Sequence, residues 1–267
     1  MGRVNKLNVM MIGDICGQPG RRTAAHYIPL LKKKYNLDLI IANGENSAGG
    51  VGITANVLEE LLELGIDCIT TGNHVWDKKE VFNFIDTEKR LIRPANYPPG
   101  TPGKGYHILS MNNYKIAVIN LLGRVFMPPI DCPFRTADQI LSEVKDRCEI
   151  IIIDFHAEAT SEKLALGYYL DGQVSCIVGT HTHIQTADER ILPEGTAFIS
   201  DIGMVGSWNS ILGVDKEPVI QKFLTGLPTK FTVASGSETI FCAVIIKIDP
   251  STTKISEIIR IQENFKF

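Results

Sequence analysis

The sequence carries almost no excess of charge of either sign. Its 27 Lys and Arg residues are balanced by 30 Asp and Glu residues, which leaves a net charge of −3 at pH 7 over 267 residues. A tight binder of duplex nucleic acid needs a basic surface that neutralises several phosphates. The densest basic run, residues 32–34, falls late in a predicted helix, where cations complement the helix dipole. The charge pattern therefore argues against a protein that binds duplex nucleic acid.

Cysteine pairs and long apolar runs are also missing. The six cysteines are scattered without a Cys-x-x-Cys pair, and most lie within apolar patterns, where cysteine acts as a small hydrophobic residue. No apolar stretch reaches the roughly 18 residues that cross a membrane. No charged start with a following apolar segment precedes the first predicted strand, as a secretory signal would require. We expect a cytoplasmic protein with reduced thiols and no membrane partner.

What the chain has instead is a succession of short apolar runs separated by helical patterns. Buried strands are predicted at residues 7–12, 37–42 and 66–70, with helices at 21–35, 54–64 and 77–85. Thr54 is the expected N-cap of the second helix. This β-α-β-α-β order with short connections predicts parallel strands joined by right-handed crossovers.

The second half of the sequence has a more antiparallel character. The expected elements are a hairpin of strands 106–110 and 115–121 that turns at Asn112, a helix 136–147, a strand 149–155, a helix 161–170 capped by Ser161, a strand 196–200, a helix 216–224, and strands 230–234, 239–249 and 254–261, the last two joined by a turn at Pro250. We predict an α/β fold, a four-layer α-β-β-α sandwich of two mixed sheets flanked by helices. One domain is expected over residues 1–267, with 203–237 as a small cap or an edge insertion.

Metal-type donors follow the ends of five apolar runs. The most informative is Gly179-Thr180-His181-Thr182-His183, and the others supply Asp14, Glu45, Asn46, Asn73, His74 and His156. Ligands of open α/β sheets gather at the carboxyl ends of the strands. Oxygen and imidazole donors without thiolates suit Mn, Fe, Zn or Mg. Eight such groups exceed the needs of one ion, so we expect two ions bridged by the two oxygens of Glu45.

Each of these residues also has a purely structural explanation. Asp14 follows a strand glycine and could belong to a turn, and the two asparagines tolerate left-handed backbone. A single buried histidine such as His156 is often held by hydrogen bonds alone. His181 and His183 alternate at a strand exit, which favours a shared ligand, and the five strand ends together favour a metal site. His26 and His107 lie away from these ends and are interpreted as structural.

Another interpretation makes the loop 13–20 a dinucleotide-binding turn. Its glycines are wrongly spaced for Gly-x-Gly-x-x-Gly, and Asp14 would repel a phosphate at this position unless a metal lay between them. We therefore do not favour this interpretation.

The chain resembles the metallophosphoesterase (calcineurin-like phosphoesterase) superfamily, and more closely the bacterial YmdB-like phosphodiesterase family. The resemblance runs almost end to end and is strongest in residues 12–14, 42–50, 71–77, 154–163 and 178–183. It implies one metal held by Asp14, Glu45, Asn46 and His183, and another held by Glu45, Asn73, His156 and His181. It also implies that His74 is the general acid. The cofactors would be two divalent or trivalent ions, iron or manganese first, with zinc or magnesium as alternatives.

Three positions depart from the superfamily pattern. Cys16 stands where the first motif has a histidine ligand, and Glu45 stands where the bridging acid is an aspartate. Val75 follows His74 where an acid is usual, so the residue that orients His74 is not identified.

The hypothesis is a metal-dependent phosphodiesterase. Two ions would bind the phosphate oxygens, a hydroxide bridging them would attack in line, and His74 would protonate the leaving oxygen. The resemblance implies a cyclic nucleotide substrate, 2′,3′-cAMP or 3′,5′-cAMP, while RNA ends and a homo-oligomer stay open. The alternatives are a non-catalytic, metal-dependent regulatory binding module and a metal amidohydrolase, which would place His-x-His near the first strand of an eight-stranded barrel.

Overall fold

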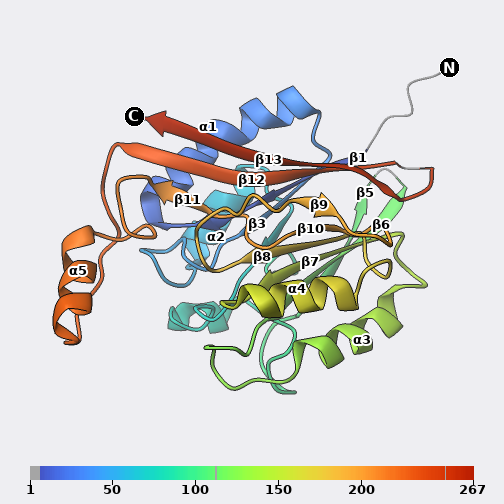
Figure 1. Ribbon diagram of the computed structural model, residues 1–267, viewed down its shortest axis with the longest axis horizontal. Helices are drawn as coiled ribbons and strands as arrows, with labels where there is room; N and C mark the ends of the chain where they lie inside the picture. The colour runs from blue at the N-terminus through green and yellow to red at the C-terminus, as the bar shows by residue number, and fades with distance from the viewer. Residues whose placement is uncertain (1–6, 112, 250) are drawn as a thin grey trace.

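Two mixed β-sheets form the centre of the protein, described here by a computed structural model that covers residues 7–111, 113–249 and 251–267 (Figure 1). The first sheet has the order β2-β11-β12-β1-β3-β4, with β13 beside β12, and the second has the order β5-β6-β7-β8-β10-β9. The strands of the first sheet are β1 (Leu7–Ile12), β2 (Asp14–Ile15), β3 (Leu39–Asn43), β4 (Cys68–Thr70), β11 (Met204–Ser207), β12 (Glu238–Ile248) and β13 (Ile255–Lys266). Those of the second are β5 (Tyr106–Met111), β6 (Tyr114–Leu122), β7 (Ile150–His156), β8 (Cys176–Thr180), β9 (Arg190–Ile191) and β10 (Ala197–Ile199).

Helices cover the outer face of each sheet. In Figure 1, α1 (Gly17–Tyr35) lies above the first sheet, and α3 (Pro133–Val144) and α4 (Thr160–Tyr169) lie below the second. Two consecutive residues of β1 show the layering, because successive side chains of a strand point to opposite faces. Met10 belongs to the same buried cluster as Ile28 of α1, while Met11 belongs to the same buried cluster as Val118 of the second sheet. The predicted four-layer α-β-β-α sandwich is therefore confirmed.

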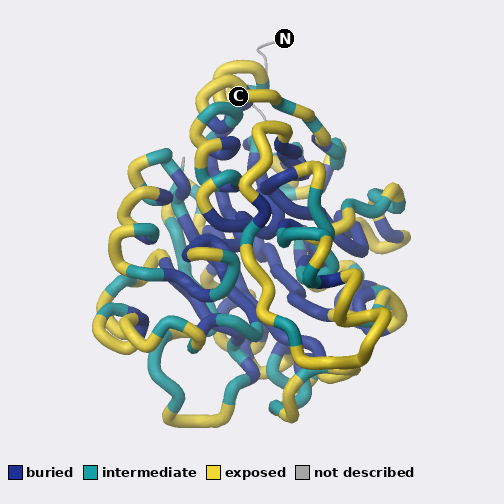
Figure 2. The backbone as a smooth tube through the Cα atoms, turned by 90° about the vertical axis from the view of Figure 1, so that its left-hand side faces the viewer, coloured by how far each residue is buried: buried dark blue, intermediate teal, exposed yellow. Residues whose placement is uncertain are grey.

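The parallel strands of both sheets bring their carboxyl ends to one edge of the molecule. In the first sheet β1, β3 and β4 are parallel neighbours, and in the second β6, β7 and β8 are. The residues of these strands are mostly buried, and Figure 2 shows the buried part of the chain at the centre of the molecule with exposed segments around it. The described strands form two sheets rather than the eight-stranded parallel barrel that a metal amidohydrolase would need.

Local sequence signals set the helix boundaries. The helix α1 begins at Gly17, four residues earlier than expected, because Pro19 is tolerated in a first turn, where its missing N–H would have no partner. It ends at Tyr35 and is followed by Asn36, whose left-handed backbone (φ 49°) lets the N–H of Leu37 bond the Lys32 carbonyl at 3.1 Å. In α2 (Ala55–Glu63) the predicted cap is confirmed, since Thr54 accepts a hydrogen bond from the backbone N–H of Val57 at 3.4 Å.

Two local predictions are wrong. Ser161 is not an N-cap, because α4 begins one residue earlier and its cap position is Ala159, which has no capping side chain. Residues 230–234 form no strand: only Val233 bridges another segment, and the chain around it is largely exposed, so no neighbouring strand completes a ladder. The helix expected at 77–85 is a shorter 3-10 helix, η1 (Lys79–Asn83). The turns expected at Asn112 and Pro250 lie outside the described residues.

The segment 203–237 supplies a strand of the first sheet and a protruding helix. Its β11 pairs with β12 and β2, and it continues into α5 (Lys216–Thr225), which stands away from the other helices at the left of Figure 1. Within the described ranges, no helix has both the length and the apolar character needed to span a membrane.

Candidate metal centre

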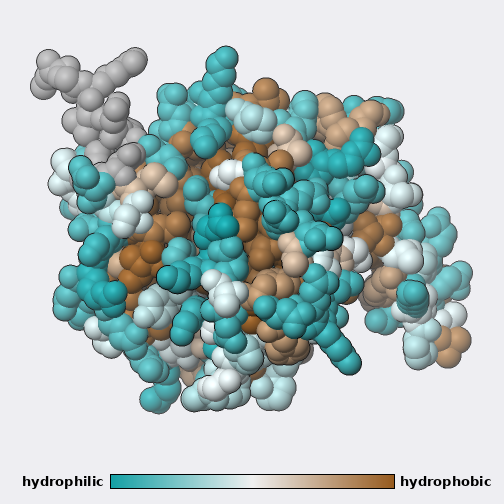
Figure 3. All heavy atoms as spheres, turned by 180° about the vertical axis from the view of Figure 1, so that it is seen from behind, coloured by the Kyte–Doolittle hydropathy of each residue, from teal (hydrophilic) through white to brown (hydrophobic). Residues whose placement is uncertain are grey.

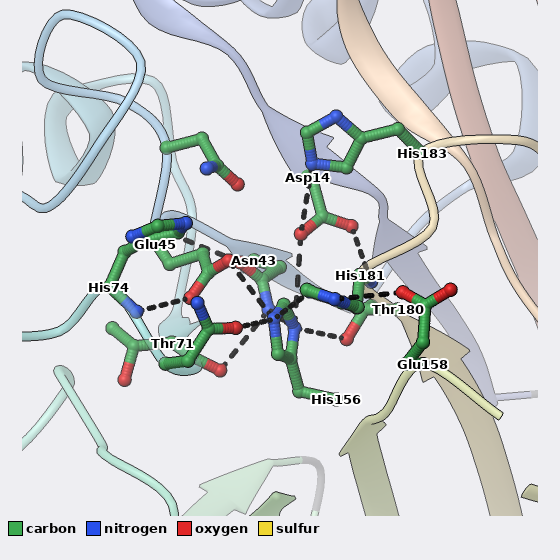
Figure 4. A network of polar contacts seen from close by, with 12 residues as sticks. Asp14, Asn43, Glu45, Thr71, His74, His156, Glu158, Thr180, His181 and His183 are labelled. Atoms are coloured by element: carbon green, nitrogen blue, oxygen red, sulfur yellow. Dashed lines mark hydrogen bonds and ion pairs between the residues drawn. The ribbon is translucent and has the colours of Figure 1, made fainter. Parts of the chain in front are cut away.

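The predicted site residues lie on loops and strand ends at the carboxyl edge of the two sheets (Figure 4). Asp14 lies in β2 just beyond β1, and His156 is the last residue of β7. The remaining residues follow β3, β4 and β8, and they are Glu45, Asn46, Asn73, His74, His181 and His183. The crossovers of a parallel sheet thus gather donors that are as much as 169 positions apart in the sequence (14 to 183).

The core of the site is the imidazole of His156, whose Nε2 contacts both a carboxylate and a second imidazole. Glu45 Oε1 lies 3.0 Å from Nε2 of His156, and the same nitrogen lies 3.0 Å from Nδ1 of His181. Ligand atoms of these three residues all lie within 4.8 Å of one another. Asn73 joins them, with its Oδ1 3.2 Å from His156 Nε2. One cation could contact all of these atoms, since such bonds are about 2.0–2.2 Å long.

His183 belongs to a second group of donors, centred on Asp14. Its Nε2 lies 3.8 Å from Asp14 Oδ1 and its Nδ1 lies 3.0 Å from the Leu212 carbonyl, so Nε2 carries the lone pair when the ring is neutral. Asp14 Oδ2 accepts the backbone N–H of His181 at 3.2 Å. Cys16 has its sulfur 3.7 Å from His183 Nδ1. The two histidines of the His-x-His motif therefore face different partners.

Two buried oxygens at this site have no hydrogen-bond partner among the described residues. They are Oδ1 of Asp14 and Oδ1 of Asn46, whose amide nitrogen donates to the Gly50 carbonyl. Burying an unpaired polar atom costs free energy, and a cation removes that cost by accepting the lone pair. These oxygens and the nearby imidazoles fit a site for positively charged ions, and hard oxygen and nitrogen donors suit Fe, Mn, Zn or Mg.

A buried hydrogen-bond chain that the sequence analysis missed sets the orientation of His156. Asp154 accepts the Thr180 hydroxyl at 2.6 Å, and Thr180 lies 2.9 Å from Nδ1 of His156. Asn43 and Thr70 also donate to Asp154. With Nδ1 occupied, Nε2 of His156 points to the donor cluster. The available signal was Asp154, an acid within an apolar strand. It lies two residues before His156, which places both side chains on the same face of the strand.

His74 has an acidic partner that the sequence analysis did not identify. Its Nδ1 lies 2.8 Å from Oδ2 of Asp77, one turn along the chain, and its backbone N–H donates to Glu45 Oε2 at 3.0 Å. A carboxylate can only accept, so the Nδ1 hydrogen points to Asp77 and Nε2 stays available at the half-buried face of the ring. The missed signal was Asp77, three residues after His74 in the sequence.

Gly72 allows the site to close. A Cβ at this position would lie 2.3 Å from Cδ2 of His156 and 2.4 Å from Oε2 of Glu45, distances that no side chain can occupy. The backbone between β4 and His74 can approach the two donors only because this residue lacks a side chain. The glycine of Gly72-Asn73-His74 therefore has a steric role in the site.

The charges of the carboxylates follow from burial and from the histidines. Burial raises the pKa of Asp14 to about 6, against the opposing effect of His183 and His156. Burial would also raise the pKa of Glu45, but the charge of His156 and its hydrogen bond hold that pKa at about 2. Glu45 is therefore ionised at neutral pH, while Asp14 titrates near the physiological range.

The imidazoles differ in the same way. Burial and the positive charge of His156 lower the pKa of His181 to about 3. Burial opposes charge on His156 as well, but Glu45 outweighs it and raises that pKa above the ordinary value. In His183 burial is outweighed by Cys16 and Asp14, and its pKa lies well above 6.5. Without cations, the imidazolium groups of His156 and His183 thus balance the carboxylates of Asp14 and Glu45. Bound cations would displace the imidazolium protons and take over their positive charge.

The backbone at the exit of β8 is unusual. His181 (φ 95°) and His183 (φ 64°) have positive φ, a conformation that is uncommon for side chains other than Gly and Asn. Such backbone persists only where its surroundings hold it, and it is concentrated at functional sites. Here the N–H of His181 is held by Asp14. This backbone turn directs the two rings of the His-x-His motif to different partners.

The sequence is similar to those of known proteins. Residues 10–261 match the model of a family described as YmdB-like protein. The chain is 53% identical over 258 residues to a protein of Bacillus subtilis (strain 168) named 2′,3′-cyclic-nucleotide 2′-phosphodiesterase, and the alignment covers 97% of both chains.

Solved structures agree. A crystal structure of a hypothetical protein from Thermus thermophilus is similar with a TM-score of 0.92 and 40% identity, covering 97% of this chain and all of that one. A structure titled as a novel phosphatase from Mycoplasma pneumoniae is similar with a TM-score of 0.93 and 34% identity, covering 98% of this chain and 95% of that one.

Proposed function

Since this chain belongs to the YmdB-like protein family, as its sequence motifs suggested, we propose that it is a metal-dependent phosphodiesterase that hydrolyses 2′,3′-cyclic nucleotides. The observation that carries the proposal is that ligand atoms of Glu45, His156 and His181 lie within 4.8 Å of one another. Beside them are two buried oxygens, Oδ1 of Asp14 and Oδ1 of Asn46, that accept no hydrogen bond from the described residues. The name of the Bacillus subtilis relative supports the choice of a 2′,3′-cyclic phosphodiester as substrate.

The ligand assignment uses each donor of the site. One ion would be held by Asp14, Glu45, Asn46 and His183, and the other by Glu45, Asn73, His156 and His181, with Glu45 common to both. Two such ions would supply Lewis acid chemistry, by neutralising phosphate charge and making water acidic. Imidazole and oxygen donors support iron or manganese, with zinc and magnesium as alternatives.

His74 would give the proton that the leaving oxygen needs. Asp77 holds its Nδ1 and Glu45 holds its backbone, which fixes the ring and leaves Nε2 free to carry the proton. Attack of water on the phosphorus would break the bond to the 2′ oxygen, and His74 would protonate that oxygen as it leaves. Asp77 would stabilise the imidazolium form of the ring before the transfer. The product would carry a 3′-phosphate.

The test is hydrolysis of 2′,3′-cAMP by protein stripped with a chelator and reloaded with Mn²⁺ or, without oxygen, Fe²⁺. We expect turnover that needs the metal, collapses in His74→Ala and survives in His107→Ala, since His107 lies on the edge strand β5. Parallel assays with 3′,5′-cAMP and with RNA ending in a cyclic phosphate rank the substrates. Two bound ions with no turnover of any diester would overturn the proposal in favour of a metal-dependent regulatory module.

We also propose that the chain works as one domain, with 203–237 as an edge insertion rather than a separate unit. Pairing of β11 with both β2 and β12 supports this arrangement. The Leu212 carbonyl, which contacts His183 at 3.0 Å, ties the insertion to the site.

A further inference from the structure

A cavity of about 520 Å³ opens beside the candidate metal centre, and the proposed chemistry leaves it without a role. Three of the site residues, Asn46, His74 and His183, lie on its wall. Its volume falls in the ~300–1,000 Å³ range typical of sites for small organic ligands. A phosphate held at the metal centre would therefore leave room in the cavity for the rest of its molecule.

The outer wall of the cavity is apolar and is formed by the segment 203–237. Its large side chains are Leu212, Val219, Phe223, Phe231 and Val233. Phe223 of α5 is 85% exposed, and Leu212 and Phe231 are also exposed. Figure 3 shows hydrophobic surface at the protruding end of the molecule where α5 lies. Apolar side chains gathered around one opening mark a place where a ligand can remove surface from water.

The polar groups of the cavity are few and mostly assigned to the metal chemistry. None of the described residues that line it is acidic, and Lys222 is its one cation outside the site, with its Nζ 5.0 Å from the centroid of Phe231. Aromatic and aliphatic surface with Lys222 as its single donor suits the face of a flat heterocycle. Such a ring stacks on aromatic side chains regardless of which hydrogen-bonding groups it carries at its edge.

We propose that this cavity binds the nucleobase of the substrate and that the Phe223 ring stacks on it. The inference rests on the proposed function, because it places the phosphate of the same molecule at the metal centre. The site and the base pocket are joined through Leu212, whose side chain lines the cavity while its carbonyl accepts Nδ1–H of His183. The binding energy of the base would thus hold the cyclic phosphate against the donors.

The test compares Phe223→Ala with Leu224→Ala, a matched control from the same helix that is 74% exposed and does not line the cavity. The substrates are 2′,3′-cAMP and glycerol 1,2-cyclic phosphate, which has the same five-membered phosphodiester ring and no base. For Phe223→Ala we expect the KM for the cyclic nucleotide to rise about tenfold, a size typical of base stacking. The kcat/KM for the glycerol substrate should stay the same within about twofold, and Leu224→Ala should change neither.

Equal effects on both substrates, or no effect on the cyclic nucleotide, would overturn the base site. A changed sedimentation of Phe223→Ala with an unchanged KM would also overturn it, because the ring would then be a contact between copies. Calorimetric titration of Mn²⁺-loaded protein with adenosine 3′-monophosphate separates this inference from the proposed function. If the protein hydrolyses neither substrate, the phosphodiesterase proposal is wrong. If, in that same protein, Phe223→Ala but not Leu224→Ala lowers the affinity for the nucleotide, the base site is still supported.

Discussion

Lys163 and Asp201 form a buried ion pair directly behind the loop that carries the two histidines. The Lys163 ammonium lies 2.7 Å from Oδ2 of Asp201, and both side chains are 2% exposed. The same oxygen accepts the backbone N–H of Thr182 at 3.1 Å, and Oδ1 of Asp201 accepts that of Gly203 at 2.8 Å. The residue between His181 and His183 is thus fixed by a carboxylate whose charge Lys163 compensates.

Lys163→Met should lower the free energy of unfolding by about 3–5 kcal/mol, because it leaves the Asp201 charge buried without its partner. Urea denaturation of the two metal-free proteins measures the difference. The control is Lys247→Met, which removes an exposed pair with Glu257 at 2.8 Å and should cost only about 0–1 kcal/mol. Similar losses in the two variants would contradict the role of the buried pair.

His74→Ala should reduce kcat/KM for the cyclic nucleotide by roughly 10²–10⁴-fold, the usual contribution of general acid catalysis. With bis(p-nitrophenyl) phosphate the loss should be much smaller, because nitrophenolate leaves without a proton. Steady-state assays with both substrates and the same metal load make the comparison. Equal losses on the two substrates would show that His74 orients the phosphate and does not donate a proton.

Asp77→Asn should lower kcat for the cyclic nucleotide roughly tenfold with little change in KM. The amide keeps the shape of the side chain but loses the charge that stabilises the His74 imidazolium, and a half-exposed bond of this kind contributes at the lower end of ~1.5–3 kcal/mol. In the His74→Ala background the same change should have no further effect. An additive loss in the double variant would place Asp77 in some other role.

Gly72→Ala should abolish tight metal binding, because the added methyl would overlap both Glu45 and His156. Metal content by atomic emission after reloading with Mn²⁺ gives the result. Gly100→Ala is the control, since Gly100 also has a special backbone conformation (φ 88°) but its Cβ would meet open space. That variant should lose some stability and keep its metal. Retention of two ions in Gly72→Ala would disprove the steric role.

Metal affinity should rise steadily between pH 5 and pH 8. Below about pH 6 a cation must displace the proton of Asp14, whose pKa burial raises to about 6. At higher pH it must displace protons of His156 and His183, whose raised pKa values keep them charged in the metal-free protein. Glu45, with a pKa of about 2, adds nothing to this dependence.

Calorimetry of Mn²⁺ binding in buffers of different ionisation enthalpy counts the released protons. Asp14→Asn should remove the part of the dependence below about pH 6 and leave the rise above it. An affinity that stays constant from pH 5 to pH 8 would contradict the charge arrangement.

The alternation of short apolar runs and helical patterns was enough to predict the parallel strands β1, β3 and β4 and the two mixed sheets flanked by helices. Such patterns are local, since each strand or helix reveals its buried face over a few residues. The same reasoning failed at 230–234, where an apolar stretch has no neighbouring strand, and it missed β2, β9 and β11. These short strands exist only because distant segments lie beside them, as Met204 lies beside Asp14.

By itself, the sequence determined which donors stand at the strand ends, because a polar residue after a buried strand is visible in the chain. Only the tertiary structure decided how these donors pair. It turns His181 toward His156 and His183 toward Asp14 through positive φ, supplies Asp77 to His74 and Asp154 to Thr180, and sets α5 beside the site. Those contacts depend on the order of strands in the sheets and on the backbone dihedral angles of single residues. Neither produces a periodic pattern in the sequence.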